Sequence, residues 1–241
     1  MKKTLAILGG AGAIGRALTL DATANDWNVI VLDLESTIEK YPVPNGVEYK
    51  YIDLFDDNLL QETFRSIGPL QGFVNTAGFT TSMQKIVDLD FEDITEVITG
   101  NLIGAFKASK LAVPKLKEGK GALVNVASGL ASFSRPKFGP YAAAKAGLIS
   151  MTKTLALEAA PSVRVNAVSP SAVDTDFIHG GAGRAQIKPL DLDFESIASN
   201  TPLKRVATPE DIVGPILFLL EGASSYMTGQ VLWVNGGSYM P

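Results

Sequence analysis

The chain opens with the stretch that decides its fold, the apolar run Thr4–Leu8 (TLAIL) followed by the glycine-rich run Gly9–Gly15 (GGAGAIG). A short, nearly continuous apolar run is typical of a buried parallel strand. Apolar residues at helical spacing continue over residues 14–22. Strand, glycine turn and helix in this order, with three glycines spaced as G-x-G-x-x-G, favour a turn that offers backbone N–H groups to a pyrophosphate. The glycines alone would also fit an ordinary tight turn.

A carboxylate at the end of the second apolar run supports a ligand-binding role for the glycine turn. The run Asn28–Leu32 ends at Asp33, eighteen residues after Gly15. A carboxylate there can accept hydrogen bonds from the ribose diol of a dinucleotide, and it repels a 2′-phosphate. Leu34 follows and offers no cation to offset this repulsion. The sequence therefore predicts NAD rather than NADP as the cofactor, with a solvated aspartate in a strand-end turn as the alternative.

Tyr141 and Lys145 stand four residues apart in a helix-favouring stretch, so their side chains share one helical face. A lysine ammonium beside a phenol favours the phenolate and lowers the pKa of the phenol, which gives a proton-transfer group usable near neutral pH. Ser128 follows the apolar run Ala122–Ala127, and a hydroxyl at a strand end can hold a carbonyl or alcohol oxygen. An isolated Tyr-x-x-x-Lys is more often a surface lysine packing along a tyrosine ring, so the pair depends on the glycine turn for its interpretation.

Composition narrows the classes of protein. The 241 residues are 46% hydrophobic, and no linker, repeat or low-complexity stretch divides them, so we expect a single domain over residues 1–241. A net charge of −4 gives no sign of binding to nucleic acid or to an anionic membrane. Without cysteine and with one histidine, neither thiolate chemistry nor a histidine-based metal site is expected. No apolar run reaches the length of a membrane span or a signal peptide, so we expect a cytoplasmic protein.

Strand-like and helical patterns alternate along the chain and predict an α/β fold with a parallel sheet covered on both faces. The expected strands lie near 4–8, 28–33, 48–53, 71–75, 121–127, 163–168 and 230–234, and the expected helices near 14–25, 57–66, 91–117, 139–159 and 209–220. The connection from Asp33 to Val47 is short and holds two prolines, which predicts only a helical stub. Residues 176–201 break the alternation and predict a substrate lid; a disordered surface loop is an equal alternative for the first half.

Over essentially its whole length the chain resembles the short-chain dehydrogenase/reductase family, in its compact single-domain branch. The matching residues are Gly9-x-x-x-Ala13-Ile14-Gly15, Asp33, Asp53, Leu54, Asn75-Thr76-Ala77-Gly78, Asn101, Ser128, Tyr141-x-x-x-Lys145, Asn166, Pro170, Thr175, Gly229, Gly236 and Gly237. Each is weak alone, but their order and spacing are specific. The resemblance implies a Rossmann-type doubly wound parallel sheet of seven strands in the order 3-2-1-4-5-6-7. It also implies hydride transfer between a nicotinamide and a carbonyl or alcohol carbon.

The resemblance further implies roles for individual residues. Tyr141 would be the general acid/base, and Lys145 would lower its pKa and bind the nicotinamide ribose. Ser128 would orient the substrate oxygen, and Asn101 would hold a water that relays protons from Lys145 to solvent. The implied cofactor-binding residues are Gly9, Gly12, Ala13, Ile14, Gly15, Asp33, Asp53, Leu54, Asn75, Ala77, Gly78, Tyr141, Lys145, Pro170, Val173 and Thr175. The implied substrate residues are Phe79, Leu130, Phe138, Ser171, Phe177 and His179.

The expected substrate pocket is mostly apolar, which suits a neutral secondary alcohol or ketone. Arg135 and Lys137, and Arg184 and Lys188 in the predicted lid, would instead hold a carboxylate, sulfonate or phosphate, unless they are only solvated surface charges. The family pattern is also altered where Ala13 replaces a usual glycine, but no catalytic group is lost.

Two other functions compete with an NAD-dependent alcohol dehydrogenase. An NADPH-dependent 3-oxoacyl thioester reductase is found among close relatives, and Asp33 argues against it. A nonenzymatic nucleotide-sensing protein is the other, and the complete set of Ser128, Tyr141, Lys145 and Asn101 argues against that. Because family members are commonly tetramers or dimers, we expect a homo-oligomer, with a homotetramer as the leading form.

Overall fold

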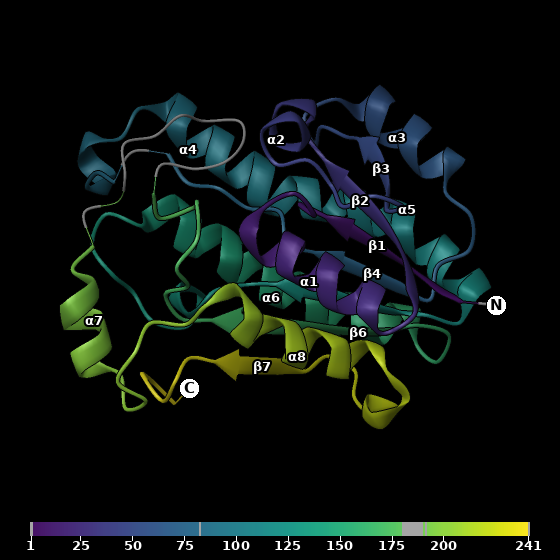
Figure 1. Cartoon of the computed structure of the whole chain (residues 1–241). Coiled ribbons are helices and arrows are strands. Elements are labelled where there is room, and N and C mark those ends of the chain that lie inside the picture. Colours follow the sequence, from purple (N-terminus) through teal and green to yellow (C-terminus); the bar gives the residue numbers. More distant parts are fainter. Residues whose placement is uncertain (1, 82, 180–189, 191, 241) are drawn as a thin grey trace.

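The computed structural model describes residues 2–81, 83–179, 190 and 192–240 (Figure 1). Within them, seven parallel strands form one sheet in the order β3-β2-β1-β4-β5-β6-β7, which confirms the predicted Rossmann-type fold. The strands are β1 Lys3–Leu8, β2 Trp27–Asp33, β3 Glu48–Tyr51, β4 Gly72–Asn75, β5 Ala122–Val126, β6 Arg164–Pro170 and β7 Val231–Val234.

Helices cover both faces of this sheet. They are α1 Ala13–Ala24, α2 Glu35–Lys40, α3 Asp57–Ser66, α4 Phe91–Ile98, α5 Gly104–Gly119, α6 Gly139–Ala159, α7 Phe194–Asn200 and α8 Pro209–Leu220, with a π-helical turn at Thr99–Ile103 and short 3-10 turns at Ile86–Asp88, Gly129–Ala131 and Gly222–Ser224. The two faces follow from the alternation of side chains along β1. Leu5 and Ile7 pack with α1 and α8, whereas Ala6 and Leu8 pack with α3, α5 and α6. Figure 1 shows α1 and α8 in front of the sheet and α5 and α6 behind it.

The chain reverses its direction of travel across the sheet between β1 and β4, which makes this the topological switch point. Leu8 at the end of β1 lies opposite Leu32 of β2 and Asn75 of β4. From β1 the chain adds β2 and β3 on one side, and it then adds β4 to β7 on the other side of β1. The loops after β1 and β4 therefore separate and leave a crevice at the carboxyl edge, where ligands bind in folds of this kind.

One predicted helix differs from the observed one. The sequence pattern gives a continuous helix over 91–117, but a π-helical turn at Thr99–Ile103 separates α4 from α5. Within this turn the side chain of Asn101 donates through Nδ2 to the Val97 carbonyl at 2.9 Å. In a regular α-helix that carbonyl would accept from the backbone N–H of Asn101 itself. The predicted stub after Asp33 is confirmed as α2.

The predicted lid is only partly described. Residues 180–189 and 191 of the predicted span 176–201 lie outside the described residues, as do Arg184 and Lys188. The described part consists of residues 176–179, Leu190 and residues 192–201, which include α7. Among the helices of the described chain, none has the length and apolar character to span a membrane.

Candidate active site

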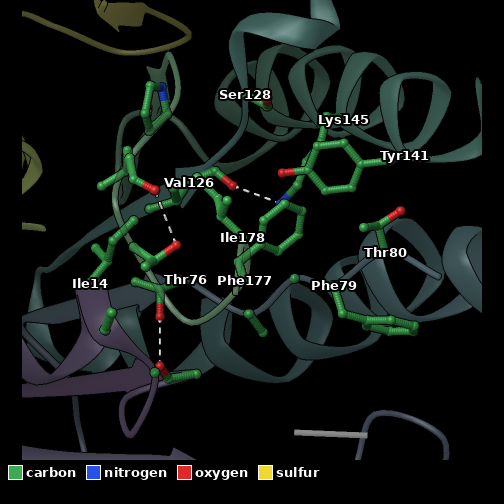
Figure 2. Close-up of a pocket in the computed structure, with 18 of the residues that line it drawn as sticks. Ile14, Thr76, Phe79, Thr80, Val126, Ser128, Tyr141, Lys145, Phe177 and Ile178 are labelled. Atoms are coloured by element: carbon green, nitrogen blue, oxygen red, sulfur yellow. Dashed lines mark hydrogen bonds between the residues drawn. The ribbon is translucent and has the colours of Figure 1, made fainter. Parts of the chain in front are cut away.

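A cavity of about 470 Å³ opens at the carboxyl edge of the sheet. Its walls come from the glycine turn, the ends of β1, β2, β4, β5 and β6, the start of α6, and α7. Figure 2 shows side chains from these segments converging on the cavity. Every residue predicted above to bind cofactor or substrate, or to take part in catalysis, lines this cavity except Asn75, Asn101 and His179.

The glycine turn forms the floor at one end of the cavity. Gly9 has a φ of +78°, and a Cβ there would lie 2.6 Å from the backbone nitrogen of Ala77. A Cβ on Gly15 would lie 2.3 Å from the Gly9 carbonyl oxygen. Both positions therefore require glycine for close approach of backbone to backbone. Helix α1 begins directly after Gly12, which has no side chain to cap it, so its first N–H groups stay available to an anion in the cavity.

Asp33 lines the cavity beside this turn and also helps to hold it. One carboxylate oxygen accepts from the Ala11 N–H at 2.9 Å, and the other accepts from the Leu34 N–H at 2.8 Å. Burial raises the pKa of Asp33, and these backbone donors oppose that rise. The Thr37 hydroxyl and the Gly12 N–H act on the pKa in the same direction, so a ribose diol would share the roughly four acceptor positions of the carboxylate with these donors. The carboxylate therefore has a structural role that the sequence did not indicate, and its ribose-binding role stays a prediction.

An ionic clamp next to the glycine turn was also not foreseen. Arg16 donates to the Ala11 carbonyl at 2.7 Å and to the Asp176 carboxylate at 3.2 Å. The guanidinium lies 4.0 Å from the centre of the Tyr41 ring, and the Tyr41 hydroxyl donates to the other oxygen of Asp176 at 2.9 Å. The clamp joins the turn, the end of α2 and the segment after β6. No sequence pattern could reveal it, because the three side chains are distant along the chain.

Ser128, Tyr141 and Lys145 come together in the other half of the cavity (Figure 2). Ser128 follows β5, and the other two lie one turn apart on α6, as the spacing predicts. The Ser128 hydroxyl is near enough to the Tyr141 phenol to lower its pKa. The Lys145 Nζ lies 5.6 Å from the centre of the Tyr141 ring and donates to the Val126 carbonyl at 3.0 Å. This places a hydroxyl, a phenol and an amine around one point of the cavity.

The electrostatics of this group differ from the sequence-based expectation. Burial raises the pKa of Tyr141 to about 12, although the Ser128 hydroxyl acts in the opposite direction. Burial also lowers the pKa of Lys145 to about 8. The prediction that Lys145 depresses the tyrosine pKa is therefore wrong for the ligand-free protein. The cost of burying a phenolate dominates, and the ammonium is directed to a backbone carbonyl.

Asn101 and Asn75 support the cavity from behind its wall. Asn101 is 1% exposed; its Nδ2 donates to the Phe79 carbonyl at 2.7 Å, and its Oδ1 accepts from the Phe79 N–H at 3.2 Å. Asn75 Oδ1 accepts from the Ala77 N–H at 3.1 Å. Both amides therefore fix the backbone of residues that line the cavity. The water-holding role expected of Asn101 remains a proposal.

His179 lies outside the cavity, although the family topology placed it among the substrate residues. Its Nε2 is 2.7 Å from Asp174 Oδ1, and its ring stacks on Phe194 with 5.8 Å between ring centres. The side chain is 56% exposed. Among the described residues, no group of three or more histidine, cysteine, aspartate or glutamate side chains could hold a metal ion.

The half of the cavity next to Tyr141 has apolar walls. Phe177 packs on Tyr141 with 5.2 Å between ring centres, and Phe79, Leu130 and Phe138 lie nearby in the same cluster. Arg135, one of the cations named as a possible anion-binding residue, lines the cavity, whereas Lys137 does not. Sequence reasoning missed several other lining residues here, namely Thr80, Phe133, Ile178, Leu190, Leu192, Ser196, Ile197, Asn200, Thr201 and Ser238.

A parallel sheet with a glycine turn at its switch point, and a Ser–Tyr–Lys group across the same cavity, define a nucleotide-dependent oxidoreductase. Comparison with known proteins agrees. The family model described as Enoyl-(Acyl carrier protein) reductase matches residues 9–239. A 3-oxoacyl-[acyl-carrier-protein] reductase, FabG, of Thermotoga maritima is 34% identical over 247 residues, covering 98% of this chain and 97% of the relative.

Two solved structures extend the comparison. A short-chain dehydrogenase/reductase from Brucella melitensis, described as a glucose/ribitol dehydrogenase, has a TM-score of 0.87 at 29% identity, covering 99% and 97% of the two chains. The protein ElxO with NADP bound has a TM-score of 0.85 at 26% identity, covering 99% of each chain. The chain thus belongs to the short-chain dehydrogenase/reductase family. It is an oxidoreductase, and members of this family use a nicotinamide cofactor.

Proposed function

We propose that the protein interconverts a secondary alcohol and a ketone with NAD as the hydride carrier. One observation carries this proposal, namely that Ser128, Tyr141 and Lys145 face the same cavity as the glycine turn and Asp33. The cavity residues fit a dinucleotide, because the turn admits no side chain at Gly9 and the N-terminus of α1 is uncapped. Such a site needs to supply little beyond position and a proton, since the cofactor carries the hydride.

The preference for NAD rests on the charges around Asp33. The described residues that line this end of the cavity include no lysine or arginine, because the cations lining the cavity in the described chain are Arg135 and Lys145. A 2′-phosphate beside the Asp33 carboxylate would therefore meet repulsion without a compensating cation.

The alternative is an NADPH-dependent 3-oxoacyl thioester reductase. The name of the Thermotoga maritima relative favours it, and the NADP in the ElxO structure favours the cofactor. The two functions differ first in cofactor. Measuring kcat/KM with NAD and with NADP, or with their reduced forms, separates them. A preference for the phosphorylated form would refute the role of Asp33, and an unchanged preference in Asp33→Ala would do the same.

In the proposed reaction each side chain has one task. The nicotinamide, when bound, accepts a hydride from the alcohol carbon or returns it to the carbonyl carbon. The Ser128 hydroxyl holds the substrate oxygen, and Tyr141 Oη takes the proton from that oxygen or gives it back. Lys145 binds the adjoining ribose and adds positive charge beside the phenol. In the ligand-free protein the raised pKa keeps the phenol protonated near neutral pH, ready to donate to a carbonyl.

Replacement of the phenol tests this mechanism. Tyr141→Phe should abolish turnover, because it removes the hydroxyl that lies beside Ser128 and transfers the proton in the proposed reaction, while NAD binding remains. Cofactor absorbance follows turnover on neutral and anionic secondary alcohols, and the fluorescence of bound NADH follows binding. Full activity in this variant would reject the assignment. If the wild type binds the cofactor but turns over neither alcohols nor ketones nor 3-oxoacyl thioesters, the nucleotide-sensing alternative gains the advantage.

We also propose that the chain is a single cytoplasmic domain that acts as a homo-oligomer, a tetramer or a dimer. Light scattering on the purified protein determines the number of subunits. Limited proteolysis tests for a single domain, and cell fractionation tests the location.

A further inference from the structure

Arg135 brings a positive charge to the apolar half of the cavity. It lies in the loop between β5 and α6, after Ser128 and before Tyr141, and is one of the residues that line the same cavity as those two. The residue is exposed to solvent. Apart from Lys145, it is the cation that the described lining residues contribute.

The Arg135 guanidinium lies against a cluster of aromatic side chains. Its Cζ lies 5.6 Å from the centre of the Phe133 ring. Phe133 in turn lies 4.6 Å from Tyr239, which lies 5.5 Å from Trp233, measured between ring centres. A guanidinium held against an aromatic face loses side-chain freedom before a ligand arrives, which lowers the entropic cost of binding.

No anionic side chain of the described chain neutralises this charge. No ion pair or hydrogen bond joins the Arg135 guanidinium to another described residue. The carboxylates that line the cavity are Asp33 and Asp53 near the glycine turn, and Asp176, which Arg16 and Tyr41 already hold. The described part of the substrate half therefore has a guanidinium but no carboxylate.

The rest of the described substrate half combines apolar side chains with uncharged polar groups, those of Thr80, Ser196, Asn200, Thr201 and Ser238, so Arg135 is its distinguishing charge. Phe79, Leu130, Phe138 and Phe177 offer no polar atom of their side chains to a ligand. An arginine at the rim presents paired N–H donors that match a carboxylate in a bidentate arrangement. We infer that Arg135 is a specificity-determining residue that binds a carboxylate of the substrate, so that the substrate class is a hydroxy acid or its oxo acid. This inference rests on the proposed alcohol–ketone reaction.

The loop supplies its own matched control. Lys137 is exposed and carries the same charge two residues later, but it does not line the cavity. Its φ of +73° turns the chain between Arg135 and Phe138. Lys137→Gln removes an equal charge from the same loop and leaves the cavity wall intact. Any effect of general surface charge would appear in both variants, whereas direct binding would appear only in Arg135→Gln.

The test compares racemic 3-hydroxy acids of four to ten carbons with their methyl esters, using the wild type, Arg135→Gln, Arg135→Lys and Lys137→Gln. We expect Arg135→Gln to lower kcat/KM for the acids about tenfold or more, mainly through KM, as for loss of a charge-assisted hydrogen bond. Turnover of the esters should not change. Arg135→Lys should restore part of the loss, and Lys137→Gln should behave as the wild type.

Three outcomes would overturn the inference. Equal losses of kcat/KM on acids and esters would show that Arg135 shapes the loop. Equal losses in Lys137→Gln would show a nonspecific effect of positive charge on the loop. A loss confined to acyl carrier protein thioesters would show docking of an acidic carrier protein. Ester turnover by the wild type shows separately that the proposed reaction occurs.

Binding without turnover gives an independent readout. Isothermal titration of the acids into the NAD complex of Tyr141→Phe, with and without Arg135→Gln, measures the contact even if no compound of the panel is turned over. Binding of the acids that is weakened by Arg135→Gln supports the inference. Binding that is absent, or unchanged by the substitution, overturns it.

Discussion

Lys145 should cost the ligand-free protein stability, so that Lys145→Met yields a more stable and inactive variant. The ammonium is 2% exposed, and burial lowers its pKa from 10.5 to about 8. At about 1.36 kcal/mol for each pH unit, holding the proton in the folded state costs roughly 3 kcal/mol at neutral pH. Methionine keeps most of the volume of the side chain without the charge.

The substitution also removes a favourable contact, and the net effect is the difference. Lys145 Nζ donates to the Val126 carbonyl at 3.0 Å, a bond that contributes about 1.5–3 kcal/mol when the donor is charged. Subtracting it leaves a net gain of about 0.5–2 kcal/mol for the methionine variant at pH 7. Turnover should be lost, because the phenol no longer has a cation beside it.

The stability difference between the wild type and Lys145→Met should depend on pH in a defined direction. The lysine pKa is depressed in the folded state, so the unfolded chain binds more protons between pH 8 and 10.5. The stability of the wild type should therefore rise with pH through this window, relative to the variant, and the advantage of methionine should vanish inside it, at about pH 9. Tyr141, whose pKa is raised to about 12, lowers the stability of both proteins above about pH 10.

Urea unfolding of the cofactor-free proteins at several pH values from 7 to about 10, at matched concentrations, measures this difference. Lys153→Met is the control, because it makes the same substitution at an exposed lysine of the same helix. A methionine variant that is less stable at pH 7, with a curve parallel to that of the wild type, would refute the reasoning. The buried ammonium would then be adequately solvated by its surroundings.

Two further predictions concern the glycine turn and the phenol. Gly15→Ala would place a methyl group 2.3 Å from the Gly9 carbonyl oxygen, so we expect loss of cofactor binding in titrations and a lower melting temperature, with a cost of roughly 1–3 kcal/mol. Gly214→Ala, at a helical glycine with open space around its Cβ position, should instead be neutral or slightly stabilising, and a similar loss there would contradict the packing argument. Because the pKa of Tyr141 is raised to about 12, alcohol oxidation at saturating substrate should accelerate with pH from about 7 to 10; a flat profile would show that the phenol is not the base.

The central strands were predictable because they are largely buried on both faces and therefore read as apolar runs, whereas the edge strand β3 is mostly exposed. The runs near 4–8 and 28–33 match β1 and β2 within one residue at each end, and helices α6 and α8 begin and end where their patterns do. Local composition determines these elements, so local composition reveals them.

The π-helical turn and the ionic clamp were not predictable in this way. In the turn, Asn101 binds the Val97 carbonyl and also the backbone of Phe79, twenty-two residues earlier. The clamp needs Arg16 beside Asp176, one hundred and sixty residues away. Neither contact leaves a periodic pattern, since each depends on which segments the folded sheet brings together.

The pKa of Tyr141 could not be predicted from the sequence either, because it depends on the folded structure. Helical spacing establishes that Tyr141 and Lys145 share a face, and the structure agrees. Spacing does not reveal burial, and burial decides the sign of the shift. From the sequence, Lys145 is expected to lower the pKa of Tyr141. In the folded chain both side chains lose solvent, which raises the pKa of the phenol and lowers that of the amine.

These buried groups explain how the site keeps its geometry without a ligand. Lys145 is held by the Val126 carbonyl at the end of β5, directly before the segment that carries Ser128. Asn101 is held by the backbone of Phe79, whose ring forms a wall of the cavity. Lys145 and Asn101, which are both buried, thus donate their hydrogen bonds to backbone that positions other residues of the site. The stability lost by burying them is the reason that removing Lys145 should stabilise the fold while ending its chemistry.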